Sequence, residues 1–136
     1  MANSRVGVTI KLLILFLFST GKNIKQNEAS PEYETPCVRY GELYTKFGTI
    51  IDKIYSHTNI DPSNLRFSKG GEILIPRVGE DPYEFSKCSY LPFPDIAIGE
   101  MISVYETEEN PIFYAYYFNT LSIISQKRSI VKSIIL

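Results

Sequence analysis

The chain opens with a short apolar run that follows a weakly basic start. Two positive charges, Arg5 and Lys11, precede an unbroken apolar run at residues 12–18, and small residues follow up to Gly21. A basic start, a short apolar core and a small-residue site are typical of a secretory signal peptide. The run is shorter than the roughly 20 residues that a helix needs to span a bilayer. We therefore predict that the protein is secreted.

Three parts are expected along the chain. Residues 1–21 form the predicted signal peptide, and residues 22–36 are polar with two prolines, so we expect a flexible lead-in there. Residues 37–136 have the length of one domain. The C-terminal run at 129–136 is short and carries Lys132, so we interpret it as a buried strand rather than a lipid-anchor tail. No membrane anchor is expected after secretion.

The charge balance disfavours a protein that follows a phosphate backbone. The chain has 14 Lys and Arg against 15 Asp and Glu, and the predicted signal peptide removes two of the basic residues. Nucleic-acid binding by counterion release needs concentrated positive charge. The sequence offers one basic cluster, at Lys127, Arg128 and Lys132. We keep Lys127 and Arg128 as candidate binding residues, and the alternative is a solvated strand edge protected by lysines.

Metal chemistry is not expected from this sequence. The mature chain has two cysteines, Cys37 and Cys88, and one histidine, His57. Zinc sites need four ligands at close spacing. These three residues lie far apart in the chain, so we predict neither a metal site nor a small-molecule cofactor.

The two cysteines suggest one disulfide. An even number of cysteines in an oxidising compartment favours pairing. A Cys37–Cys88 bond would close a loop of about 50 residues and stabilise the fold by about 4 kcal/mol in the chain-entropy model. The alternative is two buried thiols.

The pattern of apolar residues predicts an α+β fold in which one helix packs on an antiparallel β-sheet. Thr45 can cap a helix over residues 45–58, because apolar positions recur there at helical spacing. These positions are Phe47, Ile50, Ile51, Ile54 and Thr58. The later chain reads as strands. The expected strands are residues 72–78, 89–95, 96–105, 112–118, 121–125 and 130–136.

This layout resembles the ribonuclease-like secreted effectors of powdery mildew fungi, which are related to fungal guanyl-specific ribonucleases. Residues 37–54 resemble the opening of that family, with a cysteine, a Gly beside Tyr and a helix. Residues 61–67 with Gly70-Gly71 resemble its loop after the helix, and residues 88–96 resemble its Tyr-Glu-Phe-Pro-Ile segment. The resemblance implies a ribonuclease-like fold, a virulence role in a plant host, delivery into host cells and detection by immune receptors.

The family's catalytic residues are not found at the matching positions. Pro92 stands where active members have a glutamate, and residues 112–118 hold no arginine. Ser125, Gln126 and Lys127 stand where a histidine is expected. RNA cleavage by 2′-hydroxyl attack needs an acid, a base and a cationic stabiliser. We therefore expect no enzyme activity and no catalytic residues, with His57 in a structural role near a helix end.

Aromatic residues are the remaining positive signal. The chain has 10 Tyr and 8 Phe, and several of them lie in residues 112–118. If these residues form a strand, Tyr114, Tyr116 and Phe118 share one face. Tyrosine anchors are typical of protein interfaces, and stacked aromatics also suit single-stranded nucleic acid. The alternative is a second layer of core.

These observations favour a secreted, non-catalytic binding protein. Its expected partner is a host protein, with RNA as a second class of partner. One alternative is an active secreted endoribonuclease with a rearranged site. Another is an apoplastic protein that binds carbohydrate or a secreted host enzyme.

Overall fold

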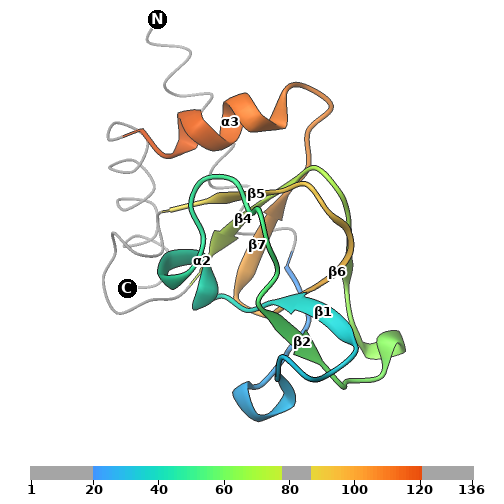
Figure 1. Ribbon diagram of the computed structural model, residues 1–136. Coiled ribbons are helices and arrows are strands. Elements are labelled where there is room, and N and C mark those ends of the chain that lie inside the picture. Colours follow the sequence, from blue (N-terminus) through green and yellow to red (C-terminus); the bar gives the residue numbers. More distant parts are fainter. Residues whose placement is uncertain (1–19, 78–86, 121–136) are drawn as a thin grey trace, which may run out of the picture.

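The computed structural model describes residues 20–77 and 87–120 (Figure 1). In chain order the elements are η1 (Gln26–Glu28), β1 (Thr35–Val38), α2 (Glu42–Thr45), β2 (Ser56–Thr58), η2 (Pro62–Asn64), β3 (Phe67–Lys69), β4 (Glu72–Pro76), β5 (Ser89–Leu91), β6 (Pro94–Ile98), β7 (Ile102–Tyr105) and α3 (Pro111–Phe118). The predicted strands at 121–125 and 130–136 and the residues Lys127 and Arg128 lie outside the described residues.

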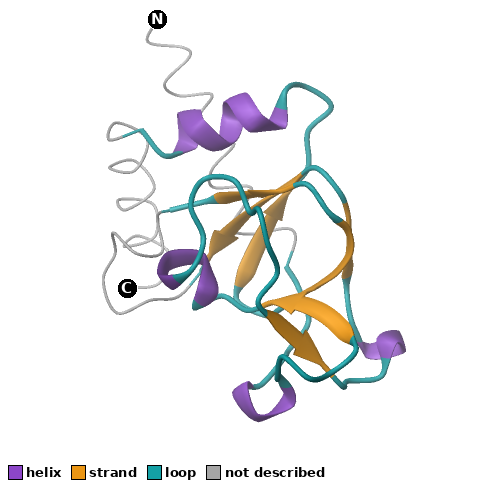
Figure 2. Cartoon of the chain, viewed as in Figure 1, coloured by secondary structure: helices purple, strands orange, loops and turns teal. Residues whose placement is uncertain are grey.

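The strands form two sheets. One has the order β2-β1-β6-β3 and is mixed, because β1 and β6 run parallel while the other pairs are antiparallel. The other has the order β5-β4-β7 and is antiparallel throughout. Figure 2 shows α3 lying over the second sheet, with β1 and β2 at the opposite end of the molecule. The described residues thus form a small α+β domain with one main helix.

The core has a layer on each side of the antiparallel sheet. Because side chains alternate along a strand, β4 sends Ile73 and Ile75 toward α3 and Leu74 toward the other sheet. The layer under α3 also holds Ala115 and Phe118. The layer between the sheets is larger, and its buried members are Val38, Leu43, Ile51, Leu74, Leu91, Ile96, Ile98, Ile102 and Val104. The antiparallel sheet is therefore buried on both faces.

The predicted helix over residues 45–58 is wrong. The helix in this region, α2, has four residues and ends at Thr45, and Ser56–Thr58 form strand β2. Between them the chain runs along β5, where the Ile51 N–H donates to the Tyr90 carbonyl oxygen at 2.9 Å. The β-branched residues here lower helix propensity. Pairing with the edge of β5 satisfies the backbone groups that a helix would have paired internally.

The predicted lead-in at 22–36 is packed rather than flexible at both of its ends. Lys22 donates its backbone N–H to the Ile98 carbonyl oxygen at 3.0 Å, and Ile24 is buried beside Cys37. Strand β1 begins at Thr35, inside this range. The polar composition of residues 22–36 predicts flexibility, but the few apolar side chains of this segment pack against the domain.

The predicted signal peptide overlaps the described residues at its last two positions. Thr20 forms an isolated bridge with Ser103. Gly21 lies so close to β6 that a Cβ atom would stand 2.1 Å from the Gly99 carbonyl oxygen, so only glycine fits there. Residues 1–19 lie outside the described part of the chain. None of the described helices has the length and hydropathy that a membrane span requires.

Candidate binding surface

Helix α3 occupies residues that the sequence pattern assigned to a strand. The Asn110 side chain caps it by accepting the Phe113 N–H at 3.1 Å, and Pro111 takes the first helical position. Both are common signals for a helix start. The expected strand at residues 112–118 left no place for a helix that starts here. The helix is apolar on every side, so its sequence has no amphipathic period that would reveal it.

The two sides of α3 meet different surroundings. Ala115 is fully buried and Phe118 is 2% exposed, and both pack on the antiparallel sheet. The opposite side holds four large apolar side chains, which we call the aromatic face. Its members are Ile112 at 42% exposure, Phe113 at 58%, Tyr116 at 56% and Tyr117 at 37%. These residues lie three and four apart, so they form one continuous strip along the helix.

The helix corrects the predicted grouping of Tyr114, Tyr116 and Phe118. Of the three, only Tyr116 lies on the aromatic face. Phe118 packs edge-on against Tyr105, with ring centroids 5.7 Å apart. Tyr114 is half-buried against the same core layer. The strand period of two had placed the three together, whereas the helical period keeps Tyr114 and Phe118 on one side and places Tyr116 on the other.

Two rings of the aromatic face, Phe113 and Tyr117, are packed against neighbouring rings. Phe113 and Tyr117 stack with centroids 6.0 Å apart and planes 7° from parallel. Tyr114 lies edge-on to Phe113, and its hydroxyl donates to the Glu109 carboxylate, which raises the pKa of Tyr114. These contacts hold Phe113 and Tyr117 in place before any partner binds. A surface ordered in advance loses less side-chain entropy on binding.

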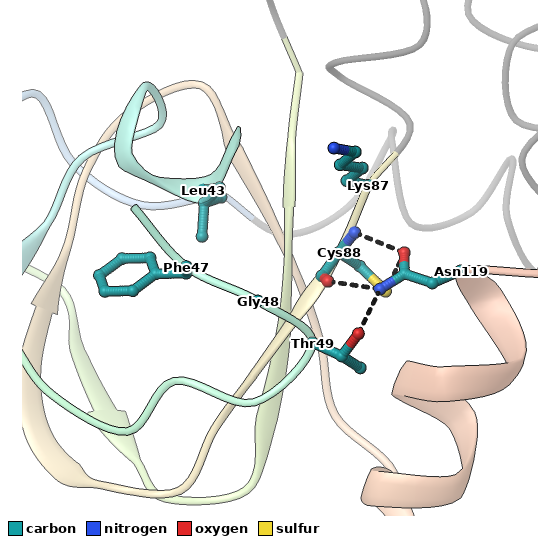
Figure 3. A pocket seen from close by; sticks show the side chains of 7 residues that line it. All are labelled: Leu43, Phe47, Gly48, Thr49, Lys87, Cys88 and Asn119. Atoms are coloured by element: carbon teal, nitrogen blue, oxygen red, sulfur yellow. Dashed lines mark hydrogen bonds between the residues drawn. The ribbon is translucent and has the colours of Figure 1, made fainter. Parts of the chain in front are cut away.

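Asn119 fixes the C-terminal end of α3 to Cys88, the residue before β5 (Figure 3). Its Oδ1 accepts the Cys88 N–H at 2.9 Å, and its Nδ2 donates to the Cys88 carbonyl oxygen at 2.8 Å and to the Thr49 hydroxyl at 3.2 Å. The Cys88 thiol donates to the Ala115 carbonyl oxygen at 3.4 Å. Asn119 thus pairs with Cys88 as a neighbouring strand would. Sequence reasoning gave no role to this asparagine.

A pocket of about 230 Å³ adjoins this contact. It is lined by Leu43, Phe47, Gly48, Thr49, Lys87, Cys88 and Asn119. The polar side chains Thr49 and Asn119 already bond one another across it, as the dashed lines in Figure 3 show. The pocket therefore presents few free polar groups to a ligand.

The predicted Cys37–Cys88 disulfide is not formed in the structure. Cys37 lies in β1, in a layer with Ile24 and Ala97, whereas Cys88 lies under α3. Burial, followed by the charge of Glu42, raises the pKa of Cys37 to about 12 against a smaller opposing effect of Arg39. An even cysteine count predicts a bond only if the fold brings the two residues together, and this fold separates them.

Glu42 and His57 do not hydrogen-bond to each other in the described structure. The Glu42 carboxylate accepts the Arg39 N–H at 3.0 Å and the Ser56 hydroxyl at 3.1 Å. His57 lies on β2, and its Nδ1 is enclosed without a hydrogen-bond partner in the described structure. Within residues 20–77 and 87–120, no three His, Cys, Asp or Glu side chains form a group that could bind a metal.

An acidic hollow lies at the N-terminal end of the aromatic face. It has a volume of about 590 Å³ and lies between the turn at residues 69–72 and the loop at residues 106–109. Pro111, the first residue of α3, also lines it. Three exposed glutamates of this loop, Glu106, Glu108 and Glu109, form what we call the acidic rim. The aromatic face and the acidic rim are therefore contiguous.

Comparison with known proteins finds no protein family, no curated protein and no solved structure that this chain matches. The fold class therefore rests on the structure itself. The resemblance to ribonuclease-like effectors rests on the sequence segments quoted for it.

Proposed function

We propose that the chain is a secreted, non-catalytic binding protein whose aromatic face contacts a partner protein. The observation that carries the proposal is the exposure of Phe113 and Tyr116, each more than half accessible, on a helix whose other side is buried. Large apolar side chains gathered on one surface mark interaction sites, and tyrosine is enriched among residues that dominate binding energy. The absence of charge along α3 suits the dehydrated centre of an interface.

The resemblance to powdery mildew effectors supports a more specific form of this proposal. In that form the partner is a host plant protein, the role is in virulence, and the protein acts after delivery into host cells. Immune receptors of the host then become a second class of partner. This form depends on the quoted sequence segments, whereas the aromatic face stands on the structure.

Site-specific crosslinking tests the binding proposal. A photoreactive phenylalanine analogue would replace Tyr116 in the full chain, and in a control it would replace Tyr55, which is 37% exposed and lies outside α3. We expect one host protein to be captured from leaf extract at position 116 and not at position 55. Mass spectrometry would identify it, and the purified protein should then bind the wild-type chain but not Phe113→Ser/Tyr116→Ser. Equal capture at both positions would contradict the proposal.

Incubation with labelled total RNA separates this function from a rearranged ribonuclease. We expect the RNA to remain intact, because His57 bonds no carboxylate in the described residues and its Nδ1 is enclosed. Cleavage by the purified chain that disappears in His57→Ala would refute the non-catalytic assignment. Phe113→Ser serves as the control, because it lies away from His57 on α3.

A further inference from the structure

We infer that the partner segment bound by the aromatic face is basic, with arginine or lysine beside its apolar anchors. This inference rests on the proposed function, because it specifies the partner of the same surface. Its basis is the charge of the acidic rim, which lies at one end of an otherwise uncharged aromatic face.

Within the described part of the chain, the acidic rim has one ion pair. Glu106 lies 4.0 Å from the Lys69 amine, and both side chains are more than half exposed, so this pair contributes little. Glu108 is exposed, and Glu109 accepts a hydrogen bond from the neutral Tyr114 hydroxyl. Among the residues that the structure describes, one lysine therefore faces three carboxylates around the hollow.

Glu72, the fourth acid of the hollow, does not belong to the binding surface. It is 3% exposed, and its carboxylate accepts the backbone N–H groups of Lys69 at 2.7 Å and Gly70 at 2.9 Å. These bonds build the turn that forms one wall of the hollow. The exposed glutamates of the other wall have no comparable bonds to the backbone of that turn, so they are open to a partner cation.

The position of the rim adds to its charge. Pro111 lines the hollow, and Ile112 begins the aromatic face, so the two surfaces are joined within one helical turn. One partner segment could therefore place one side chain in the hollow and others against the rings of the aromatic face. The exposed rings themselves favour arginine or lysine, through cation–π contact. A phosphate backbone would instead be repelled, so RNA is disfavoured at this surface.

The alternative role of Glu108 and Glu109 is to stabilise the N-terminus of α3, where negative charge is favourable. A binding experiment distinguishes the two roles. Two amphipathic peptides of about 18 residues would share apolar residues at i, i+3, i+4 and i+7 and differ in carrying arginine or glutamate elsewhere. Fluorescence anisotropy would measure the affinity of each for the full-length protein.

We expect the arginine peptide to bind about tenfold more tightly than the glutamate peptide, with affinity falling as salt rises. Glu106→Lys/Glu108→Lys should remove that preference. If this charge reversal harms folding, the neutral variant Glu106→Gln/Glu108→Gln takes its place and should reduce the preference. Glu32→Lys/Glu34→Lys is the matched control, because both glutamates are exposed and lie before β1, far from α3 (Figure 1).

Several outcomes would overturn the inference. Equal binding of the two peptides that still depends on Phe113 and Tyr116 would refute the basic partner and leave the proposed function intact. Binding of neither peptide would also refute it, and the crosslinking result would then judge the proposed function separately. Retention of RNA at this surface, or dimerisation lost in Phe113→Ser/Tyr116→Ser, would replace the basic segment with another occupant.

Discussion

Replacing Asn119 with alanine tests how α3 is held against the sheet. The substitution removes four hydrogen bonds: two to the backbone of Cys88, one from the Cys88 thiol and one to the Thr49 hydroxyl. Cys88 is 2% exposed, so water cannot readily replace the lost partner of its N–H and carbonyl groups. A buried polar group left unpaired costs about 1–3 kcal/mol.

Asn119→Ala should lower the free energy of unfolding by about 2–4 kcal/mol. Most of this comes from the two backbone groups of Cys88 that lose their partner, because the bond to Thr49 is more exposed. At a urea slope of about 1.5 kcal/mol/M, the unfolding midpoint should fall by about 2 M. Urea titration followed by circular dichroism would measure it. Thr49→Val removes only one of the four bonds and should lower the free energy of unfolding by about 1 kcal/mol.

Asn59→Ala is the control, because Asn59 is exposed and makes no side-chain hydrogen bond in the described structure. Its effect should stay within about 0.5 kcal/mol. If Asn119→Ala changes the free energy of unfolding no more than this control does, the pairing of Asn119 with Cys88 does not secure α3. The aromatic face would then need another explanation for its position.

Three further predictions concern the two cysteines and the turn before β4. Because the pKa of Cys37 is raised from 9.0 to about 12, the folded thiol keeps a proton that the unfolded thiol loses, and stability should fall as pH rises through that window. Urea titrations across this pH range should show a smaller fall in Cys37→Val, and an equal fall would contradict the assignment. A thiol reagent should also react with both cysteines in urea and with neither in the native protein at neutral pH. If neither cysteine reacts in urea, a disulfide forms. Gly70 has φ +93° with a Cβ site 3.0 Å from the Pro92 carbonyl oxygen, so Gly70→Ala should cost about 1–2 kcal/mol, while Gly48→Ala, with open space around it, should change stability by less than about 0.5 kcal/mol.

The strands of the antiparallel sheet could be predicted because their signals are local. The buried run Ile73-Leu74-Ile75 lies inside the predicted strand at 72–78 and forms the centre of β4. The alternating residues 96–105 contain β7 and part of β6, but Gly99 to Met101 interrupt them, with Met101 at φ 66°. Period-two alternation continued across that turn, so it concealed the break.

The helices could not be placed from periodicity, and the two failures have opposite causes. Residues 47–54 have helical spacing, but part of their backbone hydrogen-bonds to the edge of β5. That edge is formed by residues about 40 positions later in the chain. Helix α3 has no helical stripe, because its exposed side is as apolar as its buried side. The first failure is a tertiary contact that overrides a local preference. The second arises because the aromatic face is not part of the core.

Stability and binding are therefore expected to be separable on α3. The side chains of Ala115 and Phe118 supply its packing, and their loss would leave cavities under the helix. Phe113 and Tyr116 are each more than half exposed, and Phe113 contacts the rings of Tyr114 and Tyr117 on the same helix, so replacing the two with serine removes little buried area. Exposed apolar groups of this size lower solubility without strengthening the fold. Because these exposed side chains do not stabilise the fold, we infer that a partner covers them.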